Sequence, residues 1–100
     1  MEKYTIYCTQ EQTLKAIELG APIEGIFIPT AEQMIGWLEE HEEIDEIAPM
    51  EKGGDWVYVV YMTGYRSDIE SPKDTLYPAR PEATLAAIDA ALDYLVKNKK

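Results

Sequence analysis

Twelve residues near the middle of the chain carry its clearest structural signal: Lys52-Gly53-Gly54-Asp55-Trp56-Val57-Tyr58-Val59-Val60-Tyr61-Met62-Thr63. Glycine readily adopts the backbone angles of a tight hairpin turn, so Gly53-Gly54 predicts a turn over 52–55. The residues that follow are mostly β-branched or aromatic and predict a strand over Trp56–Thr63. Both alternating faces of this strand are apolar. We therefore expect it at the centre of a sheet, with helices or a partner chain covering both sides.

Weaker strand signals flank this hairpin. Ile44 and Ile47 anchor an extended segment up to Glu51, and Thr75-Leu76-Tyr77 is a candidate for a returning strand. Residues 66–75 are polar, contain a proline and are expected to form a loop. Two more short strands are predicted nearer the N-terminus, over Tyr4–Cys8 and Ile26–Ile28.

Two helix starts share one signal, a threonine followed three residues later by a glutamine. Thr9 with Gln12, and Thr30 with Gln33, match a capping box, in which each side chain bonds the backbone amide of the other residue. The predicted helices span Gln10–Leu19 and Ala31–Glu40, with buried stripes of Leu14 and Ile17 in the first and of Met34, Ile35 and Leu38 in the second.

A third helix is predicted over Pro81–Val96. Proline is preorganised for the first helical position, and the apolar residues that follow recur at helical spacing: Leu85, Ile88, Leu92 and Leu95. Three helices with a small antiparallel sheet of about three strands predict a single α+β domain over residues 1–100, built in two layers.

Composition excludes several classes of function. Nineteen acidic against nine basic residues give a formal charge of −10, which argues against binding nucleic-acid phosphates or an anionic membrane surface. The longest apolar run, Trp56–Met62, is far shorter than the roughly 20 residues of a membrane-spanning helix. The N-terminus lacks the pattern of a signal peptide, so a cytoplasmic protein is expected. A single cysteine, Cys8, excludes an internal disulfide and a cysteine-built zinc site.

No catalytic residue, metal ligand or cofactor site is predicted. Six acids crowd between Glu39 and Glu46, but a calcium loop needs a glycine-permitted turn that this run lacks, so a solvated connection is the favoured interpretation. His41 has no second histidine to complete a metal site, and its neighbouring carboxylates favour a surface residue that holds its proton. Cys8 is a candidate nucleophile only if His41 lies beside it, and a core position is favoured instead. Gly53-Gly54 lacks the residues of a phosphate loop.

Two groups of residues are candidate binding sites. The polar loop suggests a concave pocket in which Arg66, Asp68 and Tyr77 converge, or alternatively a hairpin connection whose side chains cap their own backbone. Trp56 and Tyr58 belong to an unusually aromatic strand, which favours a sheet face used in self-association, although aromatic residues also fill small cores.

Three motifs carry a resemblance to a family: Thr9-Gln10-Glu11-Gln12 with Ile17-Glu18-Leu19-Gly20-Ala21-Pro22, Pro29-Thr30-Ala31-Glu32-Gln33-Met34-Ile35-Gly36-Trp37-Leu38, and Arg80-Pro81-Glu82-Ala83. They resemble small uncharacterised proteins encoded by phages and mobile elements of gut Bacteroidales. The resemblance spans most of the chain and implies origin and architecture. Its motifs are helix caps and stops, so it implies no catalytic residues. The segment between the first two helices is shorter here than in many members.

The leading hypothesis is a non-enzymatic accessory protein of the phage or mobile-element type that acts by protein–protein binding. Its partner is expected to be a second copy, in a small homo-oligomer, or a host protein. One alternative is an acidic decoy that occupies a basic nucleic-acid-binding surface of a host protein, suggested by the charge of −10. The other is a small-molecule-binding domain or enzyme that uses the 66–75 loop.

Overall fold

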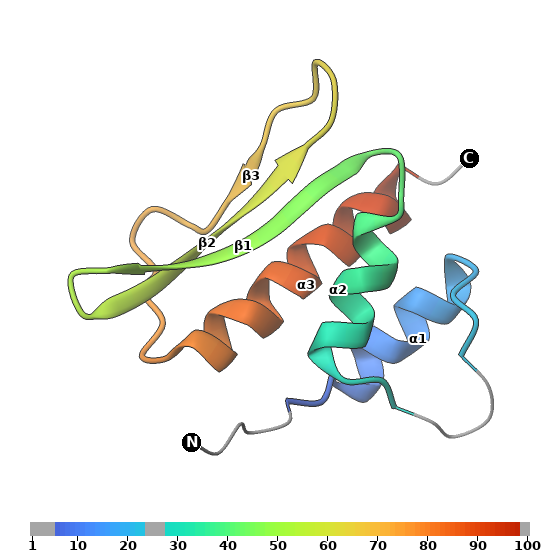
Figure 1. The fold of residues 1–100 in the computed structure, drawn as a ribbon, viewed down its shortest axis with the longest axis horizontal. Helices are drawn as coiled ribbons and strands as arrows, with labels where there is room; N and C mark the ends of the chain where they lie inside the picture. Colours follow the sequence, from blue (N-terminus) through green and yellow to red (C-terminus); the bar gives the residue numbers. More distant parts are fainter. Residues whose placement is uncertain (1–5, 24–27, 99–100) are drawn as a thin grey trace.

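A computed structural model describes residues 6–23 and 28–98 of the chain (Figure 1). These residues confirm the α+β fold, with three helices and three strands. The helices are α1 (Gln10–Glu18), α2 (Ala31–Glu39) and α3 (Arg80–Lys97), and the strands are β1 (Ile44–Lys52), β2 (Asp55–Met62) and β3 (Ile69–Glu70). No helix in the described ranges is long and apolar enough to cross a membrane.

The predicted hairpin forms as the sequence indicates. β1 and β2 pair antiparallel around a turn in which Gly53 and Gly54 have φ angles of 60° and 92°, a region that side chains rarely enter. The strand order is β1-β2-β3, so β2 is central as predicted. A register shift between Ile44 and Glu46 interrupts the pairing near the start of β1.

The third strand corrects the prediction for the loop. β3 lies within the segment predicted as a loop, whereas Thr75-Leu76-Tyr77 contributes only one isolated bridge, in which Tyr77 and Trp56 exchange two hydrogen bonds of 2.8 Å. Buried backbone groups must be paired, and the second side of β2 takes its partners from a broken segment rather than from one regular strand. Short polar loops can therefore supply a sheet edge that propensity alone does not reveal.

Two further strand predictions fall partly on residues that the structure does not describe, and their described residues form no strand. In the described part of the predicted strand over Tyr4–Cys8, Tyr7 forms an isolated antiparallel bridge with Thr30, and the Cys8 amide donates to the Pro29 carbonyl at 3.0 Å. Of the predicted strand over Ile26–Ile28, only Ile28 is described, and it belongs to no strand.

Both predicted capping boxes are present, but α1 faces the opposite way from the prediction. Leu14 is 58% exposed and Ile17 40% exposed, whereas Gln12, Thr13 and Ala16 are buried. α1 packs on α3 through these small and polar side chains, because Gln12 finds hydrogen-bond partners there. This polar contact outweighs the apolar stripe that the helical spacing suggested.

The other two helices bury the faces that were predicted. Met34 and Leu38 of α2 and Ile88, Leu92 and Leu95 of α3 join the hydrophobic core. Figure 1 shows the helices on one side of the sheet, with α3 beside the strands and α1 beyond it. The helices form one layer and the sheet the other, so only one of the two apolar faces of β2 is covered by helices of the described chain.

Candidate functional site

The sheet face that points away from the helices is the candidate site. Along β2, Tyr58, Val60 and Met62 are buried toward the helices, whereas the alternate residues Val57, Val59 and Tyr61 are only half-buried. Side chains alternate between the two faces of a strand, so these three lie together on the opposite side. This is the face that no described helix covers.

Strand register extends this surface onto β1. Ala48 pairs with Val59 and Met50 with Val57, which places both β1 residues on the same side as their partners. Met50 is 38% exposed. We call the resulting apolar surface the open face, and it consists of Ala48, Met50, Val57, Val59 and Tyr61.

Charged residues border the open face at both ends and along its β3 side. The register puts Glu46 beside Tyr61 and Glu70 beside Val59, and it puts Lys52 and Asp55 at the hairpin turn. Antiparallel sheets that face water normally carry polar side chains on that side. A contiguous apolar centre with a charged border is instead the composition of a protein-binding surface.

The predicted aromatic residues lie on the covered face. Tyr58 is buried and its ring lies 6.1 Å from that of Tyr77, while Trp56 is half-buried with the Arg80 guanidinium 5.9 Å from its ring centroid. Burial raises the pKa of Tyr58, with smaller contributions from Tyr77, Asp89 and Asp93. Trp56, Tyr58 and Tyr77 thus join the sheet to the start of α3 rather than lining the open face.

The structure does not bring the predicted loop residues to one pocket. An Asp68 carboxylate oxygen accepts from the Met62 amide at 2.8 Å, and Arg66 donates to the Thr63 carbonyl at 3.3 Å. Tyr77 instead pairs with Trp56. Seven residues of extended chain separate Trp56 from Thr63, or about 23 Å. Arg66 and Asp68 therefore lie at one end of β2 and Tyr77 lies at the other.

Cys8 and His41, the two residues considered as a possible nucleophile and its partner, are engaged in packing. Burial raises the pKa of the Cys8 thiol to about 11, with a further contribution from Asp89, so almost no thiolate exists at neutral pH. The His41 ring packs edge-on against Trp37, with centroids 4.6 Å apart.

In the acidic run, a Glu39 carboxylate oxygen accepts from the Ile47 amide at 2.9 Å. Within residues 6–23 and 28–98, no group of three metal-ligating side chains lies close enough together to hold a metal ion.

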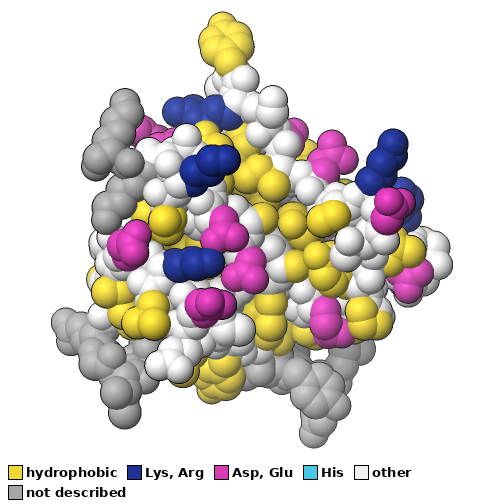
Figure 2. Space-filling model, turned by 180° about the vertical axis from the view of Figure 1, so that it is seen from behind, with side chains coloured by type: hydrophobic (Ala, Val, Ile, Leu, Met, Phe, Trp, Pro, Cys, Tyr) yellow, Lys and Arg dark blue, Asp and Glu magenta, His cyan; other side chains and the backbone are white. Residues whose placement is uncertain are grey.

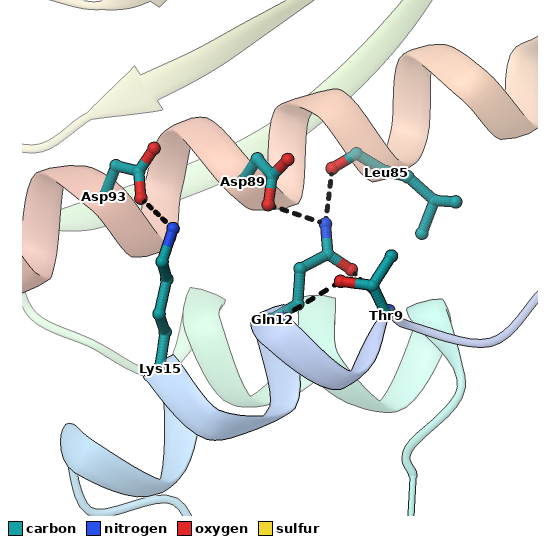
Figure 3. A network of polar contacts seen from close by, with 6 residues as sticks. All are labelled: Thr9, Gln12, Lys15, Leu85, Asp89 and Asp93. Carbon is teal, nitrogen blue, oxygen red and sulfur yellow. Dashed lines mark hydrogen bonds and ion pairs between the residues drawn. The ribbon is translucent and has the colours of Figure 1, made fainter.

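A polar network that the sequence did not reveal joins α1 to α3 (Figure 3). Gln12 is 1% exposed, and its amide nitrogen donates to the Leu85 carbonyl at 2.8 Å and to Asp89 at 3.0 Å. Lys15 forms an ion pair of 2.6 Å with Asp93, which raises the lysine pKa through that hydrogen bond. In the described residues every buried side-chain polar atom has a partner, so this network holds the helices together rather than awaiting a ligand.

A small cavity lies against α2. Its volume is about 190 Å³ and its lining is mainly apolar, and includes Pro22, Pro29, Met34 and Trp37. Gln33 is the one polar residue in the lining, and its side-chain oxygen already accepts from the Thr30 amide at 2.9 Å. Ligand pockets usually enclose about 300–1,000 Å³, so the open face is the stronger candidate.

The sequence of β2 shows its two apolar faces, whereas the contribution of β1 to the open face is not evident from the sequence. Ala48 and Met50 alternate with Ile47 and Pro49, a weak signal that acquires meaning only with the register. Comparisons of the chain with models of protein families, with curated proteins and with solved structures found no match. Function is therefore inferred from the surface of the molecule itself.

Proposed function

We propose that this chain is a non-enzymatic protein that acts by protein–protein binding, and that its open face binds a second copy of the chain. The observation that carries the proposal is the contiguous apolar surface of Ala48, Met50, Val57, Val59 and Tyr61, on the sheet face without a helix. Burying such a surface removes apolar area from water, which stabilises association by about 25 cal/mol for each Å².

The open face is suited to pairing with itself. Val59 lies near the middle of β2, with Val57 and Tyr61 on either side. A two-fold axis across the strands places β1 on β1 with the strand directions reversed, so each end of one face meets the other end of its copy. With the axis at Pro49, midway between Glu46 and Lys52, Lys52 of one chain lies over Glu46 of the other, twice. The apolar centres and the charges at the two ends are thus complementary in the same arrangement, whereas the two Glu70 carboxylates beside Val59 come near each other and oppose it.

The size of the open face implies weak association. A sheet of three strands is about 14 Å wide, and the eight residues of β2 extend about 26 Å, which gives roughly 350 Å² of projected face for each copy. Stable interfaces bury at least about 1,200 Å² in total. We therefore expect a dimer that forms and dissociates with concentration rather than a permanent one.

Sedimentation velocity across roughly 10 μM to 1 mM tests the proposal, in the concentration range typical of weak interfaces. The mass is expected to rise from 11.4 kDa toward twice that value. Val59→Asp places a charge at the centre of the open face and is expected to keep the protein monomeric. Val59→Thr, which retains the strand preference, should weaken association by a smaller factor.

Leu14→Asp is the matched control, because it adds the same charge to a residue that is 58% exposed on α1, away from the open face. Its self-association is expected to equal that of the unmodified chain. A chain that stays at 11.4 kDa throughout the range would refute the dimer, as would equal effects of Val59→Asp and Leu14→Asp. Far-UV circular dichroism checks that each variant is folded.

The two alternative functions receive less support. A decoy of nucleic acid needs a continuous negative surface, but Figure 2 shows Lys and Arg side chains among the Asp and Glu, with hydrophobic side chains between them, on the side that it views. A small-molecule site in the loop needs Arg66, Asp68 and Tyr77 close together, and they lie at the two ends of β2.

A further inference from the structure

The outer edge of β1 has an unusual pattern of backbone donors. In an antiparallel pair, successive residues alternately direct their N–H and C=O groups toward the partner strand and away from it. The Ile47 amide donates to Glu39 rather than to β2, so the backbone N–H and C=O groups of Ile47 point away from β2, while its side chain is buried in the core. The alternation then directs the backbone groups of Pro49 and Glu51 away from β2 as well.

Two of these three outward positions offer no free N–H group. The Ile47 amide is occupied by the Glu39 carboxylate at 2.9 Å, and Pro49 has no amide hydrogen. Glu51 is exposed beside the turn, at the end of the strand. Because an added strand needs alternating donors and acceptors along its whole length, this edge is a poor template for one.

We infer that Glu39 and Pro49 close the free edge of β1 against the addition of a strand from another chain. Glu39 is the last residue of α2, so the end of the helix supplies the carboxylate that occupies the strand edge. A strand that approached β1 would have to displace a charge-assisted hydrogen bond at Ile47 and would find no donor at Pro49. The opposite edge is formed by β3, which has only two residues and is too short to direct pairing.

The closed edges limit how copies of the chain can associate. If the edge of β1 were free, pairing edge to edge could continue from chain to chain and produce an open assembly. With the edge closed, association is confined to the open face, which forms a closed pair. This last consequence rests on the proposed dimer, whereas the closure of the edge itself does not.

Amide hydrogen exchange tests the role of Glu39 directly. In Glu39→Ala the Ile47 amide loses its acceptor and is expected to exchange at least about tenfold faster, in line with the strength of a hydrogen bond to a charged group. Glu39→Gln keeps an oxygen that can accept the bond, so its Ile47 amide should exchange within a few-fold of the original rate. Unchanged exchange in Glu39→Ala, or equal acceleration in both variants, would overturn the inference.

A second measurement tests the closure of the edge, apart from the dimer. Glu39→Ala and Pro49→Val are combined in a chain that also carries Val59→Asp, so that association through the open face is blocked. Concentration-dependent assemblies larger than those of Val59→Asp alone are expected in sedimentation, with increased β-sheet signal in circular dichroism. If the combined variant is folded and keeps the mass of Val59→Asp alone, the inference is wrong, whatever the result for the proposed dimer.

Discussion

Gln12 shows how much one side chain contributes to this fold. Its side-chain oxygen accepts from the Thr9 amide at 3.0 Å, and its nitrogen bonds Leu85 and Asp89 on α3. One residue therefore caps its own helix and attaches it to another. Gln33 makes the same capping box at the start of α2, with bonds of 2.9 and 3.1 Å, but it is exposed and has no described bond to another helix.

The two glutamines form a matched pair for mutation. Gln12→Ala removes half of a capping box and two buried hydrogen bonds, so the free energy of unfolding is expected to fall by about 2–3 kcal/mol. Gln33→Ala removes only the cap contact and should cost about 1 kcal/mol or less. Urea unfolding followed by circular dichroism measures both values. Equal losses would contradict the assignment of Gln12 as the contact that joins α1 to α3.

At the scale of elements, the segment after β2 is the least regular part of the sheet. It pairs with β2 through a side chain at Asp68, through the backbone at Ile69, and at Ser71, whose amide donates to the Tyr58 carbonyl at 2.9 Å. It pairs again through Tyr77. Side-chain acceptors thus replace backbone acceptors where the chain leaves the strand path, which allows a polar segment to cover the second side of a central strand.

Asp68 provides the test of this interpretation. Asp68→Ala leaves the Met62 amide without its acceptor and is expected to lower the free energy of unfolding by about 1–2 kcal/mol. Asp68→Asn retains an oxygen and should lose less than half of that. Arg66→Ala removes only exposed contacts with Thr63, so a change within about 0.5 kcal/mol is expected. If urea unfolding shows no loss for Asp68→Ala, the residue is not structural and the binding-site hypothesis regains support.

At the scale of the whole molecule, the net charge of −10 on each copy opposes association. Two copies brought together repel each other unless opposite charges meet at the contact. The proposed antiparallel stacking places Lys52 of each copy near Glu46 of the other. This arrangement offsets part of the repulsion at the border of the open face, and it distinguishes this orientation from stacking with parallel strands.

Charge reversal tests the orientation. Lys52→Glu puts like charges opposite each other at two symmetric positions and is expected to weaken the dimer by roughly tenfold at low salt, with a smaller effect at high salt. Adding Glu46→Lys to the same chain recreates opposite pairs and should recover most of the affinity. Sedimentation equilibrium measures the dissociation constants. A dimer that the second substitution does not restore would rule out the antiparallel arrangement while leaving the open face as the contact.

Local signals in the sequence were sufficient for the three helices and the β1–β2 hairpin, but not for β3. The Gly53-Gly54 turn, the two capping boxes and the two-residue alternation of β2 each depend on neighbouring residues only, and each is present in the structure. The α+β class and the central position of β2 followed from them. An alternating strand has two possible inner faces, however, and an amphipathic helix can be overruled by a polar contact made elsewhere.

Tertiary structure decided the features that bear on function. Leu14 and Ile17 of α1 face solvent because Gln12 is hydrogen-bonded to α3. The Glu39 carboxylate lies at the edge of β1. Tertiary structure also determined that the helices cover Tyr58 and leave Val59 on the open face. These outcomes depend on residues up to 77 positions apart in the chain, as in the bond from Gln12 to Asp89. Sequence periodicity specifies which side chains share a face, whereas long-range packing specifies what that face meets.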